Sequence, residues 1–99
     1  MRFKFKKRKL QELYTDEKNA QKYPNVVDDF FEVMAIIGAA KDERDLYVLK
    51  GLRFEKLSGQ REKSGQRLLR LNKQWRLIVS VEKDEDGTYL LIIDIEDYH

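Results

Sequence analysis

The sequence contains no cysteine, one histidine and one proline. Without cysteine, neither a disulfide framework nor a thiolate metal site can form. A single histidine also excludes a metal site built from several histidines, although carboxylates could still bind magnesium. We expect no bound metal and no cofactor.

Long apolar runs are also missing. The longest, such as residues 89–93, are far shorter than the roughly 20 residues that a membrane span needs. The basic segment 1–10 lacks the apolar stretch of a secretory signal. No nucleophile elbow, phosphate-binding glycine loop or nucleotide fingerprint is present, which argues against covalent catalysis or nucleotide hydrolysis. These absences predict a soluble, cytoplasmic protein that does not bind membranes.

The 99 residues predict a single domain, 1–99. Their net charge of only +2 hides an uneven distribution of charge. Residues 1–9 carry six basic side chains and no acidic one, and residues 50–76 carry nine basic and two acidic ones. The segments 10–49 and 77–99 are acidic. A dense basic block is either a polyanion-binding surface or a solvated charged surface, and composition alone does not separate the two.

The periodicity of apolar residues predicts an α+β domain with two N-terminal helices packed on a twisted antiparallel sheet. The expected helices run from Lys7 to about Thr15 and from Pro24, in a first turn, to roughly Ala40, followed by a charged loop, Lys41–Asp45. The expected strands are Arg2–Lys6 at an edge, Leu52–Leu57, Arg67–Leu71, Trp75–Val81 and Thr88–Ile95. Polar loops are expected at Ser58–Gly65 and, as a hairpin turn, at Asp84–Gly87.

The hairpin loop 72–74 decides where two arginines lie. With these three residues in the loop, Arg70 pairs with Arg76 and both point away from the face that carries Leu69 and Leu77. Like charges directly across a strand pair repel, so the arrangement favours an anion such as phosphate above them. The alternative is that either arginine bridges to Asp94 or Glu96 on the neighbouring strand.

Two further groups could carry proton-transfer chemistry. The chain closes with Asp97, Tyr98 and His99, directly after an apolar strand whose pairing could hold them in place. Histidine and tyrosine titrate near ~6.5 and ~10, which suits acid–base roles, although a lone terminal histidine is otherwise unremarkable. Glu55 is a plausible general base if it faces the arginines; otherwise it is exposed to solvent or pairs with Arg53 or Lys56.

Three segments together resemble the HigB-type killer toxins of type II toxin–antitoxin systems, in the RelE/ParE superfamily. They are residues 52–59 (LRFEKLSG), 67–77 (RLLRLNKQWRL) and 95–99 (IEDYH). The resemblance covers essentially the whole chain, and the closing Glu-Asp-Tyr-His with Trp-Arg upstream is its most specific part. It implies a ribosome-dependent messenger RNA endoribonuclease that acts without metal and is inhibited by a helix-turn-helix antitoxin, which represses the shared operon.

The resemblance also implies roles for individual residues. Glu55, Asp97, Tyr98 and His99 fall on the family's catalytic positions, although well-studied relatives have histidine where this chain has Glu55. A carboxylate can accept a proton, but it cannot be a cation beside a phosphate. We expect Glu55 or His99 as base, His99 or Tyr98 as acid, and Arg70 and Arg76 on the phosphate, with Asp97 orienting a neighbour.

The nuclease hypothesis further predicts basic side chains that contact the RNA backbone, of the message or of the ribosome, and make binding sensitive to salt. These residues are Arg53, Lys56, Arg61, Lys63, Arg67 and Lys73. The expected partners are the HigA-like antitoxin, the ribosome and messenger RNA, with operator DNA reached only through the antitoxin. Two alternatives remain: a ParE-like toxin that acts on DNA gyrase without cutting RNA, and a degenerate toxin that only binds its antitoxin.

Overall fold

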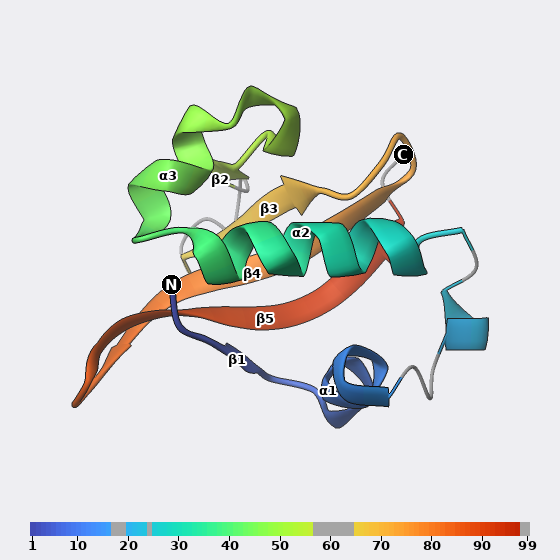
Figure 1. Cartoon of the computed structure of the whole chain (residues 1–99), viewed down its shortest axis with the longest axis horizontal. Helices are drawn as coiled ribbons and strands as arrows, with labels where there is room; N and C mark the ends of the chain where they lie inside the picture. The colour runs from blue at the N-terminus through green and yellow to red at the C-terminus, as the bar shows by residue number, and fades with distance from the viewer. Residues whose placement is uncertain (17–19, 24, 57–64, 98–99) are drawn as a thin grey trace.

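The computed structural model describes residues 1–16, 20–23, 25–56 and 65–97. Within these ranges the chain forms an α+β domain, which confirms the predicted class (Figure 1). Its helices are α1 (Arg8–Asp16), α2 (Val27–Ala39) and α3 (Glu43–Val48), with 3-10 turns η1 (Ala20–Lys22) and η2 (Lys50–Leu52). Its strands are β1 (Phe3–Phe5), β2 (Glu55–Lys56), β3 (Gln66–Arg70), β4 (Trp75–Asp84) and β5 (Gly87–Asp97).

The five strands form one sheet in the order β1-β5-β4-β3-β2. β2 to β5 pair antiparallel, as predicted, but β1 pairs parallel with β5, so the sheet is mixed and the prediction of a fully antiparallel sheet is wrong. The main-chain bonds Leu90 N to Arg2 O (3.0 Å) and Lys6 N to Ile92 O (2.8 Å) extend this pairing. The first and last strands of the chain therefore lie side by side, with β1 at an edge.

One face of the sheet packs against α1 and α2. Leu69, Leu77 and Val79 are fully buried on this face, and each belongs to the hydrophobic core. The helices contribute side chains at helical spacing, as predicted, and these are fully or almost fully buried. From α1 they are Leu10 and Leu13, and from α2 they are Phe30, Val33, Met34 and Ile37.

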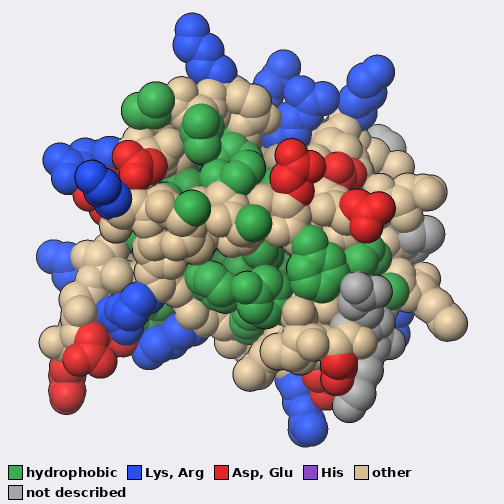
Figure 2. All heavy atoms as spheres, in the orientation of Figure 1, with side chains coloured by type: hydrophobic (Ala, Val, Ile, Leu, Met, Phe, Trp, Pro, Cys, Tyr) green, Lys and Arg blue, Asp and Glu red, His purple; other side chains and the backbone are tan. Residues whose placement is uncertain are grey.

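The surface over this face is mostly apolar at its centre. Figure 2 shows hydrophobic side chains gathered along α2, with lysine and arginine side chains mostly around the rim. Partly buried rings at the edge of the core pack against one another. Tyr14 lies with ring centroids 5.5 Å from both Phe3 and Phe5 and 6.0 Å from Phe31. α2 begins at Val27, with Asp28 and Asp29 in a first turn whose dipole favours acidic residues. Pro24 lies outside the described residues.

The segment predicted as a charged loop, Lys41–Asp45, instead begins helix α3. The Asp42 carboxylate accepts from the backbone N–H of Arg44 (2.9 Å), and Asp45 accepts from the backbone N–H of Lys41 (2.8 Å). The first bond satisfies a donor that an uncapped helix start leaves free, and the second links the helix to the residue before its N-cap. Hydrogen bonds from the Arg44 side chain and backbone lower the pKa of Asp42 to about 2. The charged residues are therefore the cap of a helix.

The strand predicted at Leu52–Leu57 begins later than expected. Leu52 ends the 3-10 turn η2, and of the described residues in this segment Glu55 and Lys56 pair with β3. Arg53, between Leu52 and Glu55, has a left-handed backbone with φ of 47°, which is uncommon for a residue with a side chain. Extended pairing cannot pass through that conformation, so β2 begins only after it. Residues 57–64, most of the predicted polar loop, lie outside the described residues.

Among the described residues, none of the helices combines the length and the apolar character needed to cross a membrane. The turn predicted at Asp84–Gly87 is confirmed, because Asp84 pairs with Gly87 at the end of the β4–β5 hairpin. Gly87 has φ of 111°, a conformation that L-residues rarely adopt. The sharp reversal therefore depends on glycine at this position.

Candidate active site

The sheet face opposite α2 carries two rows of side chains that cross the strands. Because directly paired residues share a face, the strand register defines each row. One row is Arg70, Arg76 and Glu96, from β3, β4 and β5. The next is Glu55, Leu68, Ile78 and Asp94, from β2 to β5. Charged groups from the basic and the acidic segments of the sequence therefore meet on one surface.

The predicted pairing of the two arginines is confirmed. Arg70 is the register partner of Arg76, and the backbone N–H of Leu71 bonds to the Trp75 carbonyl (3.0 Å), which closes the loop 72–74. The two guanidinium groups also converge on one acceptor. Arg70 Nε donates to the main-chain carbonyl of Asn72 at 3.3 Å, and Arg76 Nη1 donates to the same oxygen at 2.6 Å.

Arg76 is the more deeply placed of the pair. Only 7% of it is exposed, and its Nη1 also donates to the Trp75 carbonyl at 3.1 Å. A buried guanidinium requires such acceptors, because an unpaired charge away from water is costly. Glu96 lies directly across from Arg76 on β5. The alternative of a bridge from the arginine pair to Asp94 is not what the described contacts show, since Asp94 is held by lysines.

Asp94 ties this face to the start of α1. Its carboxylate accepts from Lys7 Nζ at 2.5 Å and lies 3.8 Å from Lys9 Nζ. Burial alone would raise the pKa of Asp94, but hydrogen bonds from Lys7 and from the backbone N–H of Ile95, with the charges of both lysines, lower it. The ionised form is therefore the one that the fold stabilises.

This shift predicts how the Asp94→Asn variant responds to pH. A carboxyl group whose pKa is lowered by folding stabilises the fold above its ordinary pKa of 3.8, and that contribution disappears as the pH falls through the folded value. We expect Asp94→Asn to lower the free energy of unfolding at neutral pH by less than about 1 kcal/mol, because the pair is partly exposed. In urea denaturation the difference should shrink as the pH is lowered below 3.8.

The matched control for that measurement is Glu85→Gln, in the exposed tip of the β4–β5 hairpin. It removes the same charge without removing an ion pair of the sheet face, and it should leave stability nearly unchanged at either pH. A deficit of Asp94→Asn that is equal at neutral and acidic pH would show that the carboxylate is not held by the lysines.

Glu55 is brought beside Arg76. The two residues line a small cavity of about 60 Å³ together with Arg53 and Leu68. Arg53, which also lines this cavity, has a left-handed backbone, and such conformations concentrate at functional sites. Glu55 itself is exposed, so a substrate could reach its carboxylate. Glu55 therefore faces the arginine side of the sheet and is also exposed to solvent, and its role as a base stays a prediction.

Arg70 also opens onto a second, larger cavity. This space of about 350 Å³ lies between α2, η2 and the end of β3, and its walls include Asp29, Glu32, Leu49 and Leu71. Carboxylates and apolar side chains line it beside the one arginine and Lys50. The smaller cavity at Glu55 and Arg76 is therefore the better match to a phosphate.

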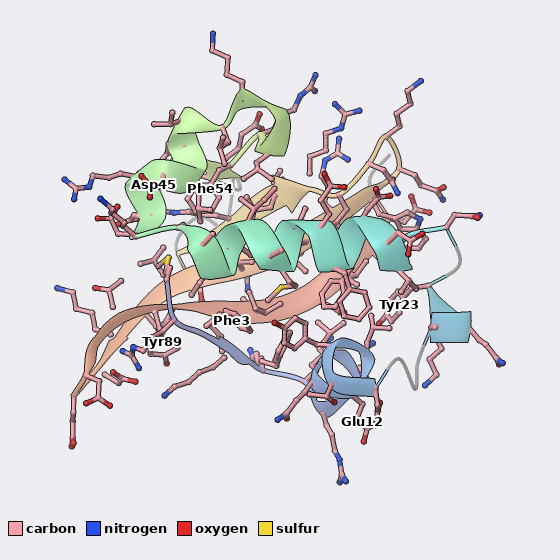
Figure 3. The ribbon with its side chains drawn as sticks, viewed as in Figure 1. Phe3, Glu12, Tyr23, Asp45, Phe54 and Tyr89 are labelled. Atoms are coloured by element: carbon pink, nitrogen blue, oxygen red, sulfur yellow. The ribbon has the colours of Figure 1, made fainter. Side chains whose placement is uncertain are left out.

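Not every predicted RNA contact lies near the arginine pair. Lys56 and Arg67 are register partners on the opposite face. Arg67 donates to Glu43 (2.9 Å) and to the Tyr47 hydroxyl (2.6 Å), and its guanidinium lies 5.6 Å from the ring centre of Phe54. Phe54 is labelled in Figure 3, where it lies close to α3. Contact of Arg67 with RNA stays a prediction. Lys73 is exposed at the tip of the 72–74 loop, whereas Arg61 and Lys63 lie outside the described residues.

The chain's last strand brings Asp97 to the hairpin loop. Asp97 pairs with Trp75 in register, and its carboxylate accepts from Gln74 Nε2 at 3.1 Å. This placement puts Asp97 at the same end of the sheet as Arg76, although on the other face. Tyr98 and His99 lie outside the described residues, so their predicted roles stay predictions.

Two residues of the site carried little signal in the sequence. The sequence indicates Glu96 only as a possible partner of the arginines, yet its register places it in their row. The sequence predicts Asn72 only as a loop residue, yet its carbonyl oxygen is where the two guanidinium groups meet. Asparagine is common in tight loops because its side chain can bond to the backbone two residues on, and that preference was the available clue.

Taken together, the described residues place Arg70 and Arg76 side by side on one sheet face, and Arg76 shares a small cavity with the accessible carboxylate of Glu55. Guanidinium groups can bind a phosphate and stabilise negative charge that develops on it, and a carboxylate can accept a proton. A family model described as the RelE-like toxin HigB of type II toxin–antitoxin systems matches residues 3–99.

The chain belongs to the HigB-like toxin family.

The resemblance seen in the sequence is thereby confirmed, and one relative agrees with it. Toxin HigB-1 of Vibrio cholerae serotype O1 is 37% identical over 79 residues, which cover 79% of this chain and 81% of the relative. The solved structure of a YoeB/ParE toxin from Agrobacterium tumefaciens aligns with all of both chains at a TM-score of 0.57 and 13% identity, which shows a shared fold. Membership in a toxin–antitoxin family implies that this HigB-like toxin has an antitoxin partner.

Proposed function

We propose that this HigB-like toxin is an endoribonuclease that cuts messenger RNA while it is translated on the ribosome. The observation that carries the proposal is the placement of Arg70, Arg76 and Glu55 on one sheet face, with Glu55 and Arg76 lining the same cavity. The family adds support, because RelE-like toxins are known as ribonucleases. The proposed partners are the ribosome, messenger RNA and a HigA-like antitoxin, in the cytoplasm.

The proposed reaction is a transesterification within the RNA strand. A base, Glu55 or His99, takes the proton of a ribose 2′-hydroxyl, and the resulting oxygen attacks the adjacent phosphorus. The bond from phosphorus to the 5′-oxygen of the next nucleotide breaks, and an acid, His99 or Tyr98, gives that oxygen a proton. A 2′,3′-cyclic phosphate and a free 5′-hydroxyl are left, and no oxidant, metal or cofactor enters the balance.

The two arginines stabilise the negative charge that develops on the phosphate during this reaction. The phosphate gains negative charge as the 2′-oxygen adds, and preorganised donors lower the energy of that state more than they lower the energy of bound substrate. Arg70 and Arg76 are already held at one point by the Asn72 carbonyl, so little reorganisation is needed. Glu55, on the neighbouring row, is the base that fits this geometry.

Mapping of RNA 5′ ends tests the proposal. The toxin is induced in cells that carry two reporter messages, identical except that one lacks its start codon. We expect new 5′-hydroxyl ends within the codons of the translated reporter and none in the untranslated one. Inhibited replication with intact messages would instead point to a gyrase-directed toxin. A toxin that leaves both growth and messages unaffected but still binds its antitoxin would be degenerate.

A further inference from the structure

The side chain of Asn72 is bonded at both ends. Its Oδ1 accepts from the backbone N–H groups of Gln74 and Trp75, each at 2.9 Å. These bonds curl the 72–74 loop around the amide and fix the turn that brings β3 back into β4. They also fix the plane of the peptide group that carries the Asn72 carbonyl.

The other end of the amide reaches the start of α2. Asn72 Nδ2 donates to Asp29 Oδ2 at 2.9 Å and to the Asn25 carbonyl at 3.2 Å. Asn25 has φ of 67°, a left-handed conformation that asparagine tolerates better than most residues. The loop is thereby attached to α2, the helix that packs against the opposite sheet face.

The main-chain carbonyl of the same residue accepts from both arginines, at 3.3 Å from Arg70 Nε and 2.6 Å from Arg76 Nη1. We propose that Asn72 is a positioning residue: it transmits the position of Asp29 on α2 to the two guanidinium groups and aims them at the scissile phosphate. This inference rests on the proposed function and names a residue that acts through the arginines rather than on the substrate.

The acceptor that the two arginines share is a neutral carbonyl oxygen and not a carboxylate, and this difference matters for anion binding. Two cations placed directly across a strand pair repel each other, so they need a shared acceptor. A carboxylate at that point would hold them but would cancel one of the two charges and compete with the phosphate. A carbonyl oxygen has two lone pairs and no net charge, so it can accept from both groups and leave their charge available. The geometry of the loop therefore suits anion binding.

The experiment exchanges the donor and the acceptor of the hydrogen bond between Asn72 and Asp29. In Asn72→Asp the side chain still accepts from Gln74 and Trp75, but it meets the Asp29 carboxylate as a like charge. Adding Asp29→Asn restores a donor–acceptor pair with the direction reversed. The matched control adds Asp28→Asn, which removes a charge from the exposed neighbouring position, to Asn72→Asp. Asn72→Ala removes the side-chain bonds altogether.

Two measurements are made on each variant. The first is the rate of cleavage of a translated message in a reconstituted system, with kcat and KM determined separately. We expect Asn72→Ala and Asn72→Asp to lower kcat by about 10-fold or more while KM changes little, because misplaced reacting groups reduce the rate more than they weaken binding. Asp29→Asn should restore most of the rate to Asn72→Asp, whereas Asp28→Asn should not.

The second measurement does not depend on activity. The Nε–H resonance of Arg70, observed by nitrogen-15 NMR, reports its bond to the Asn72 carbonyl. We expect this resonance to shift and its proton to exchange faster in Asn72→Ala and Asn72→Asp, and to return when Asp29→Asn is added. Should Asn72→Ala fail to fold, the comparison of the two double variants still decides the matter.

The two measurements separate this inference from the proposed function. If the wild-type protein cuts no translated message, the nuclease proposal falls, and the Arg70 resonance alone shows whether Asn72 holds the arginine. If the wild type cuts, the role of Asn72 is overturned by wild-type kcat in a folded Asn72→Ala, by an unmoved resonance, or by equal rescue from Asp28→Asn and Asp29→Asn.

Discussion

Replacing Arg76 with alanine should lower the rate of messenger RNA cleavage by about 10²–10³-fold, the cost of removing one preorganised donor from developing charge. Arg76 is the buried member of the arginine pair and lines the cavity that Glu55 shares. The rate is measured on ribosome-bound message with purified toxin. Far-UV circular dichroism and the unfolding midpoint are recorded beside it, because the change also empties a buried position.

The Arg76→Lys variant tests whether positive charge is enough at this position or whether the planar guanidinium shape is also needed. Lysine keeps the positive charge but has one compact ammonium in place of a planar fork, so it cannot reproduce the two carbonyl bonds and also face a phosphate. We expect a folded protein with a rate between those of the wild type and Arg76→Ala. Arg8→Ala, an exposed arginine on α1 paired with Glu12, is the control and should cut like the wild type. Full activity in folded Arg76→Ala would remove the arginine pair from the mechanism.

The parts of the fold that the sequence predicts well are those whose pattern is local and periodic. The apolar spacing of α2 places Phe30, Val33, Met34 and Ile37 on one side, and all are buried there. The alternation in β3 and β4 likewise places Leu69 and Leu77 in the core and the arginines on the other face. A slip of one residue in the strand pairing would turn these apolar side chains to the other face, so burial of one face fixes the register. The sequence pattern is therefore enough to predict these parts of the fold.

The direction of β1 is not contained in such a pattern. Alternating Phe3 and Phe5 predict a strand with one apolar face, and the structure confirms an edge strand. Whether it runs parallel or antiparallel depends on β5, more than 80 residues away in the chain. A parallel pair needs a long crossover between its strands, and here nearly the whole chain forms that connection.

The segment Lys41–Asp45, which contains the start of helix α3, is predicted as a loop because all five of its residues are charged. Charge was a poor guide, since acidic side chains at the start of a helix accept from its unpaired N–H groups. Asp42 makes such a bond with the N–H of Arg44, and Asp45, three residues later, accepts from the N–H of Lys41 just before the helix. The spacing resembles a capping box, and an apolar Leu46 follows it, fully buried. That combination was the overlooked signal.

The sequence predicts which side chains meet at the candidate site, but it does not predict the main-chain group that they share. The three-residue loop fixes the register, so the pairing of Arg70 with Arg76 follows from the sequence. The acceptor that relieves their repulsion is the Asn72 carbonyl, a group that every residue has. Only the three-dimensional course of the loop shows where that oxygen lies. The same limit applies to Glu96, whose row depends on a register shift in β4 and β5 between Ile78 and Val79.

The largest effect on stability is expected for Phe30→Ala. Phe30 is fully buried on α2, and its ring centre lies 6.4 Å from that of Tyr14 and 5.7 Å from that of Phe31. Truncation of a buried phenylalanine costs about 3–5 kcal/mol through lost burial and the cavity left behind. A domain of this size has a total stability of about 5–15 kcal/mol, so the unfolding midpoint should fall by roughly 15 °C or more.

Phe31→Ala is the matched control, because it removes the same ring from the neighbouring position, where the side chain is only partly buried. Its cost should be clearly smaller, since part of that ring is already in contact with water. Chemical denaturation of both variants gives the two free energies directly. A loss below about 1 kcal/mol in Phe30→Ala would mean that α2 is not fixed against the sheet by this ring. Asn72 would then be attached to a helix that is free to shift, and some other contact would have to hold the two arginines in position.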